Sequence, residues 1–104
     1  SSTCIVGIDC EMVGVGRGGI ESALARCSIV TFRKDDDDGV TVLYDVYVKP
    51  TKKVTDYRTQ WSGITPRHLS GDNVKSLKKC RMDVMELISS TVDGKMVIIV
   101  GHSL

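Results

Sequence analysis

The sequence contains no apolar run approaching the roughly 20 consecutive residues needed to cross a bilayer. Its longest run, residues 96–100, has the length of a single strand. The N-terminal residues lack the basic region of a signal peptide, and the chain carries no targeting motif. We therefore expect one globular domain or less, with no membrane partner.

Paired cysteines of the kind that bind zinc or exchange disulfides are also absent. The four cysteines, Cys4, Cys10, Cys27 and Cys80, form no C-x-x-C motif, which disfavours zinc sites and thioredoxin-like redox sites. The first three lie in apolar, strand-like segments, where a thiol acts as a small core side chain. This usage indicates a reducing compartment, the cytosol or the nucleus.

A strong excess of either charge is missing, because the formal net charge is +1. Four of the thirteen acids form one run at residues 35–38, and without them the rest of the chain would carry +5. The run is typical of a solvated loop, and a role in protein interaction is the alternative. The basic remainder is compatible with a phosphate-rich partner but does not require one.

The pattern of apolar residues predicts an α/β fold in the order β-β-β-α-β. Period-two alternation or β-branched residues predict three strands, and apolar spacings of three and four predict a helix that Gly94 ends. A final apolar run predicts a buried strand parallel to the first. The predicted elements are strands at residues 4–13, 22–32 and 40–48, the last two forming a hairpin, a helix at 74–92 and a strand at 95–100. Residues 51–73 are expected to be irregular, with a helical turn after Thr65-Pro66.

Asp9 and Glu11 near the end of the first strand are the candidate functional residues. Two positions apart on a strand, both carboxylates project from one face, and they repel each other unless a cation lies between them. Oxygen ligands on a rigid strand suit Mg²⁺ or Mn²⁺, and two such ions activate water on a phosphodiester. The wet face of an edge strand is the alternative, but the preceding residues on that face are apolar or glycine, which favours an interior strand.

Residues 14–19 also match the G-x-G-x-x-G pattern of dinucleotide-binding folds. That reading requires a long helix after Gly19, whereas residues 22–32 have the composition of a strand. A flexible loop beside the acids is the interpretation we prefer, and a dinucleotide-binding domain stays as the less favoured alternative.

Five segments carry a more specific signal: VGIDCEMVG at 6–14, LARCSIV at 24–30, VLYD at 42–45, DYRTQWSGIT at 56–65 and VGH at 100–102. Together they resemble the DEDDh 3′–5′ exonucleases, in the branch of RNA exonuclease 4, the interferon-stimulated nucleases and the apoptosis-enhancing nucleases. The resemblance covers nearly the whole length, and the acidic run at 35–38 departs from it in a loop, where insertions are tolerated.

The resemblance implies a ribonuclease H-like fold, two Mg²⁺ or Mn²⁺ ions, and stepwise hydrolysis of RNA or single-stranded DNA from the 3′ end. It implies that Asp9 and Glu11 are catalytic metal ligands, that Met12 packs on the terminal nucleoside and that Arg58 reaches the sugar-phosphate. Without the family, core packing of Met12 and a surface ion pair of Arg58 are the alternatives. The resemblance also implies a nuclear or nucleolar location, with the cytoplasm as the alternative.

The family's remaining acids and its general-base histidine would follow residue 104. We therefore expect residues 1–104 to be the N-terminal part of a single exonuclease domain, inactive or nearly so alone. His68, expected in an exposed turn, and His102, at a structural Gly-His, do not replace them. A non-catalytic nucleic-acid-binding module of the same fold is the alternative. The candidates for a basic approach or for base stacking, with solvated surface as the alternative, are Arg26, Lys52, Lys53, Arg67 and Trp61.

Overall fold

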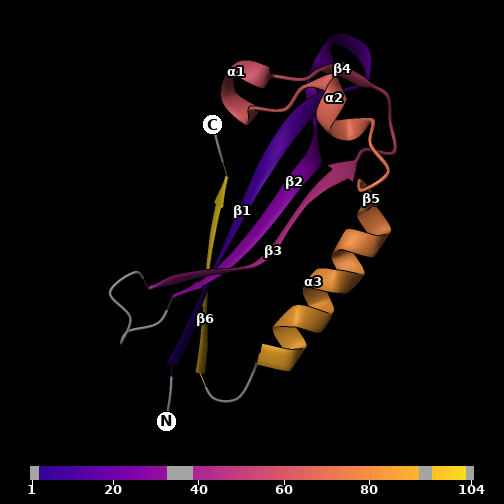
Figure 1. Cartoon of the computed structure of the whole chain (residues 1–104). Coiled ribbons are helices and arrows are strands. Elements are labelled where there is room, and N and C mark those ends of the chain that lie inside the picture. Colours follow the sequence, from indigo (N-terminus) through magenta and orange to yellow (C-terminus); the bar gives the residue numbers. More distant parts are fainter. Residues whose placement is uncertain (1–2, 33–38, 92–94, 103–104) are drawn as a thin grey trace.

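The computed structural model describes residues 3–32, 39–91 and 95–102, and for residues 3–4, 91, 95–100 and 102 it describes the backbone alone. It is a mixed α/β fold built on a six-stranded sheet in the order β4-β1-β2-β3-β5, with β6 pairing β1 (Figure 1). The strands are β1 (Thr3–Val15), β2 (Glu21–Phe32), β3 (Val40–Lys49), β4 (Val54–Asp56), β5 (Lys75–Ser76) and β6 (Lys95–His102). The predicted hairpin is confirmed, because β2 and β3 pair antiparallel.

Strand β1 is an interior strand of the sheet. It pairs antiparallel with β2 along one edge and parallel with β6 along the other. Its apolar composition suits this position, since both of its edges are paired within the sheet. The predicted β-β-β-α-β order and the parallel pairing of the last strand with the first are both confirmed.

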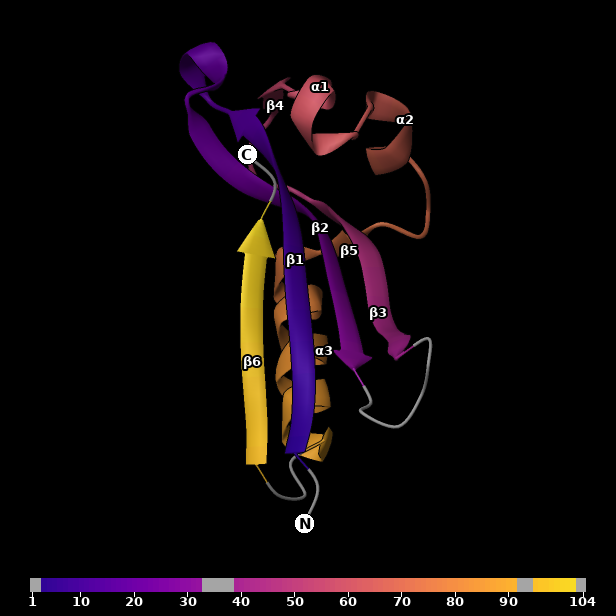
Figure 2. The same cartoon turned by 90° about the vertical axis from the view of Figure 1, so that its left-hand side faces the viewer.

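Helix α3 (Leu77–Thr91) covers one face of the sheet, and no other described helix covers the lower part of the opposite face (Figure 2). The helix was predicted to start at residue 74, which is wrong by three residues. Lys75 and Ser76 instead form β5, which pairs with the end of β3. The Ser76 hydroxyl then accepts the backbone N–H of Lys79 at 3.0 Å and satisfies a donor at the first turn. The predicted terminator Gly94 lies outside the described residues.

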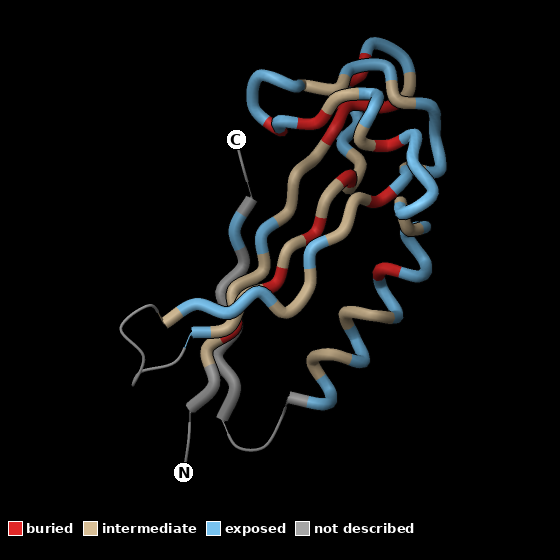
Figure 3. Tube along the Cα trace, viewed as in Figure 1, coloured by how far each residue is buried: buried red, intermediate tan, exposed pale blue. Residues whose placement is uncertain are grey.

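A first core cluster fills the space between the sheet and α3. Its fully buried members are Val6, Cys27, Ile29, Val48 and Cys80. Figure 3 shows the buried residues, in red, along the strands, in the cap of short elements and on α3. Cys27 and Cys80 act here as small core side chains, as predicted for Cys27 from its strand-like segment. Ile29 is completely buried, so its burial contributes about 2 kcal/mol to the stability of this layer.

A cap of short elements packs on the opposite face at the far end of β1, β2 and β3. It consists of η1 (Arg17–Gly19), β4, α1 (Thr59–Ser62) and α2 (Pro66–Leu69). The turn predicted after Thr65-Pro66 is confirmed as α2, whereas the rest of residues 51–73 is more regular than predicted. The cap is held by a second cluster of buried side chains: Val13, Val15, Ala25, Ile64 and Leu69. None of the described helices is long and apolar enough to cross a membrane.

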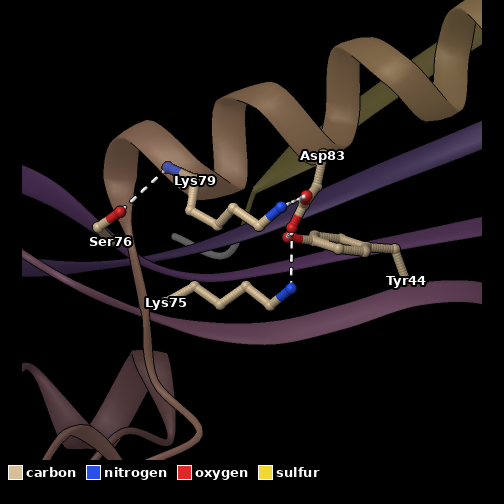
Figure 4. Close-up of polar contacts among 5 residues, drawn as sticks. All are labelled: Tyr44, Lys75, Ser76, Lys79 and Asp83. Atoms are coloured by element: carbon tan, nitrogen blue, oxygen red, sulfur yellow. Dashed lines mark hydrogen bonds and ion pairs between the residues drawn. The ribbon is translucent and has the colours of Figure 1, made fainter.

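A polar clamp ties α3 to β3 (Figure 4). The Tyr44 hydroxyl and the Lys75 ammonium both donate to Asp83 Oδ2, at 2.8 and 2.9 Å, and Lys79 lies 3.0 Å from Asp83 Oδ1. Chiefly through Lys75, these donors hold the pKa of the Asp83 carboxyl well below its ordinary value. The clamp therefore stabilises the fold only while Asp83 is ionised.

Replacing Asp83 with Asn should make the stability of the fold less dependent on pH. Because the pKa of Asp83 is depressed on folding, its contribution is fully present above about pH 4, the ordinary carboxyl pKa, and is lost as the pH falls through the folded-state pKa. Urea unfolding between pH 7 and pH 2 should show a weaker D83N protein at neutral pH, with a smaller loss in acid. The exposed Asp72 provides the matched control D72N, and an acid dependence that D83N and D72N share would contradict the clamp.

Candidate active site

Asp9 and Glu11 project from the same face of β1, as predicted. The register of β1 and β2 is continuous there, with Asp9 opposite Ser28 and Glu11 opposite Arg26. On its other side Asp9 pairs with Gly101 of β6. Both acids therefore lie on an interior strand, and the alternative of an edge strand is excluded.

The face that carries the acids is open beside Asp9. Asp9 is exposed and Glu11 is half-buried. A Cβ atom added at Gly101 would lie 3.9 Å from Asp9 Oδ1, an ordinary contact, so the glycine leaves additional room next to this carboxylate. Cys10 pairs with Cys27 of the α3-side core, so its thiol does not join the carboxylates on the acid face.

A bidentate ion pair lies beside the acids on the same face. Arg26 donates from Nε and Nη2 to the two carboxylate oxygens of Asp45, at 2.9 and 2.8 Å, and the Ser28 hydroxyl donates to Asp45 Oδ1 at 2.9 Å. The Arg26 hydrogen bond holds the pKa of Asp45 below its ordinary value. Asp45 is thus already satisfied by protein donors. Its place beside the acids was missed from the sequence, although it ends the VLYD segment.

Next to Arg26, on the side away from the acids, two aromatic rings stack on each other. The Arg26 guanidinium lies 5.4 Å from the centre of the Tyr47 ring, and the Tyr47 ring stacks on His68 at 4.8 Å with an interplanar angle of 5°. His68 Nδ1 also accepts the backbone N–H of Thr65 at the start of α2. The expectation of an exposed His68 was therefore wrong, because ring stacking and helix capping hold it half-buried.

Arg58 directly precedes helix α1, and its side chain ties the cap to the glycine-rich loop near the end of β1. Its Nη1 donates to the Ser22 hydroxyl at 2.8 Å and its Nη2 to the Gly19 carbonyl at 3.0 Å. Ser22 pairs with Gly14, three residues beyond Glu11, so this contact is roughly 10 Å along β1 from the second acid. Its predicted contact with the sugar-phosphate stays a prediction.

Met12 is half-buried and lies opposite Leu24, which packs against the core on the α3 side. The register of β1 and β2 shifts between Glu11 and Met12. The structure therefore does not bring Met12 together with the acids, and its predicted contact with a nucleoside stays a prediction.

The glycine-rich loop leads into a strand. Gly14 belongs to β1, a single turn of 3₁₀ helix spans Arg17–Gly19, and β2 begins at Glu21. A dinucleotide fingerprint needs a helix at this point to bind the pyrophosphate. The dinucleotide-binding alternative is therefore wrong.

Within the described part of the chain, no cluster of three or more His, Cys, Asp or Glu side chains forms a complete metal site. Asp9 and Glu11 are consequently the pair that could hold a divalent cation on this face. Their oxygen donors and the space beside Gly101 fit Mg²⁺ or Mn²⁺.

Comparisons with known proteins identify the family of the chain. The family model described as "Exonuclease" matches residues 6–104. The apoptosis-enhancing nuclease of Pongo abelii is 41% identical over 103 residues, which cover 99% of this chain and 27% of the relative. RNA exonuclease 4 of Mycosarcoma maydis is 46% identical over 97 residues, which cover 93% of this chain and 22% of the relative.

Solved exonucleases share the fold. The crystal structure of a full-length 3′-exonuclease superposes with a TM-score of 0.67 at 16% identity, over 93% of this chain and 45% of that one. The RNA exonuclease module of Saccharomyces cerevisiae Pan2, solved with AAGGAA RNA, has a TM-score of 0.60 at 25% identity, over 86% of this chain and 16% of that one.

The chain spans about a quarter of the length of these curated relatives. The family model, by contrast, matches nearly all residues of this chain, including both acids of β1. The chain therefore belongs to the exonuclease family, as a domain of ribonuclease H-like fold related to the RNA exonucleases.

Proposed function

We propose that this chain is part of a metal-dependent exonuclease that hydrolyses RNA or single-stranded DNA from the 3′ end. The observation that carries the proposal is the position of Asp9 and Glu11, side by side on one open face of an interior strand, in a chain of the exonuclease family. The name RNA exonuclease 4 and the Pan2 module solved with RNA favour RNA as the substrate. We also propose a nuclear or nucleolar location, with the cytoplasm as the alternative.

Asp9 and Glu11 would hold two Mg²⁺ or Mn²⁺ ions together with further oxygen ligands. When bound, such ions lower the pKa of a coordinated water and stabilise the leaving oxygen of a phosphodiester. The chain itself supplies rigidity, because the backbone of Asp9 is paired with β2 on one side and with β6 on the other, and that of Glu11 is paired with Arg26 of β2. Arg26 is held by Asp45, so the positive charge beside Glu11 is oriented before any substrate arrives.

We further propose that the activity belongs to a longer protein that includes this chain. Divalent cations of this kind need about six oxygen ligands, and the described residues bring two carboxylates together. The short coverage of the curated relatives supports the same proposal. A non-catalytic nucleic-acid-binding module is the second candidate, favoured by the same shortage of ligands.

Nuclease assays on 5′-labelled RNA test the direction of hydrolysis. With Mn²⁺, this chain should leave a 20-nucleotide RNA almost intact, and any products should form a ladder shortened one nucleotide at a time. The double substitution D9A/E11A should remove the ladder. Internal cuts, or a ladder that survives D9A/E11A, would contradict the assignment of these acids.

Metal titration followed by NMR tests the ligand assignment directly. Mn²⁺ should broaden the resonances around Asp9 and Glu11 with a dissociation constant of about 1 mM, because two carboxylates form an incomplete site. D9N/E11Q should abolish the effect, whereas E86Q on the exposed side of α3 should retain it. Micromolar affinity would contradict the missing-ligand argument, and broadening centred elsewhere would contradict the site.

Substitution of Arg58 separates a substrate contact from a structural one. If its guanidinium reaches the sugar-phosphate, R58A should weaken oligonucleotide binding about tenfold, as expected for a lost charged contact of about 1.4 kcal/mol. The control S22A removes the hydrogen bond to Arg58 and should change binding less than twofold. Fluorescence anisotropy measures both variants. Equal effects of the two substitutions would leave Arg58 a structural role only.

A further inference from the structure

A groove of about 460 Å³ lies between the segment after β3 and helix α2. The segment from Lys49 to Val54 forms one side of it, and Pro66, Leu69 and Ser70 form the other. It is separate from Asp9 and Glu11, neither of which lines it. Within the part of the chain that the structure describes, the groove is thus a concave region apart from the acids.

The charge of this groove has one sign. Its described lining includes Lys49, Lys52 and Lys53 and no acidic residue. Lys52 lies 3.0 Å from Glu21, but both side chains are more than half exposed, so the pair is weak. Lys49 and Lys53 are exposed and form no ion pair within the described residues. Three ammonium groups on one rim suit a ligand with several negative charges.

The floor of the groove is apolar and partly aromatic. Val54, Tyr57 and Leu69 belong to, or pack against, the buried cluster of the cap, so the floor is formed before any ligand binds. Tyr57, which is half-buried, and Pro66 both line the groove. A charged rim above an aromatic floor matches single-stranded nucleic acid, whose phosphates meet the cations while its sugars and bases contact the floor.

The groove and the acids lie on the same side of the sheet. Glu11, Arg26 and Tyr47 form one row across β1, β2 and β3, and Lys49 follows Tyr47 by two residues on the same face. With strands about 4.8 Å apart and a rise of about 3.3 Å per residue, Lys49 is on the order of 12 Å from Glu11 between Cα atoms. His68 of α2 faces Tyr47, while Leu69 and Ser70 line the groove, so α2 borders both regions.

We propose that this groove binds the phosphate backbone of the nucleic-acid strand, a few nucleotides from the end presented to Asp9 and Glu11. The proposal rests on the proposed function, because it takes the same strand as its ligand. Binding here is electrostatic and independent of sequence, and it needs no divalent ion. The lysine groove therefore holds the substrate, and the acids of β1 provide the ligands for hydrolysis.

Binding of a 5′-fluorescein-labelled 12-nucleotide RNA without divalent ions tests the proposal on the full chain. K49A/K53A should weaken binding about tenfold in 50 mM salt and lower the slope of log K against log salt by about 1.4, since each phosphate contact contributes about 0.7 for a single strand. K49R/K53R, which keeps both charges, should bind within about twofold of the unsubstituted chain. Circular dichroism checks that the variants fold.

The matched control K78A/R81A removes two exposed cations from α3, on the other side of the sheet. It should leave binding within about twofold, because the screening length at this salt is only slightly more than 10 Å. Equal losses in both double variants would overturn the groove as a site. If K49A/K53A leaves binding unchanged, the groove proposal is overturned and the proposed function is not. If the unsubstituted chain does not bind the RNA at all, both the groove proposal and the proposed function are overturned.

Discussion

Pairing of β1 along both of its edges is the constraint on which the site depends. Asp9 has Ser28 on one side and Gly101 on the other, so its backbone is bonded in both directions and cannot shift without breaking the sheet. The chain has therefore already lost the conformational entropy of bringing two carboxylates together, as part of the cost of folding. A cation that binds between them gains from that rigidity, because the ligands need no further ordering.

The two faces of β1 differ in how their side chains are satisfied. Toward α3 the layer is closed by apolar contacts and by the Asp83 clamp, which hold the sheet in place. On the other face, the Arg26–Asp45 pair resembles a potential metal site but is closed to one, because both Asp45 oxygens accept bonds from protein donors.

Periodicity was enough to predict the strands, the hairpin and the side of β1 from which the acids project, because burial imposes a regular pattern on both strands and helices. It failed where a contact distant in the chain decides the structure. Val74 continues the helical spacing, yet Lys75 and Ser76 after it are drawn into pairing with β3. Asp45 could not be placed beside Asp9 from the sequence, because its register depends on an irregularity in β3 between Tyr44 and Val42 that no local pattern reveals.

On the face that carries the site, the Arg26–Asp45 ion pair lies between the acids of β1 and the lysines at and after the end of β3. Acidic side chains at Asp9 and Glu11 repel a phosphodiester, whereas the rim around Lys49 and Lys53 attracts it. In the proposed mechanism, a strand held in the groove would approach the acids closely only when divalent cations neutralise them, so binding and hydrolysis would depend on different ions. Monovalent salt would weaken binding by screening the lysines. Hydrolysis would need the metal, so a chain with this arrangement would hold its substrate before it could cut it.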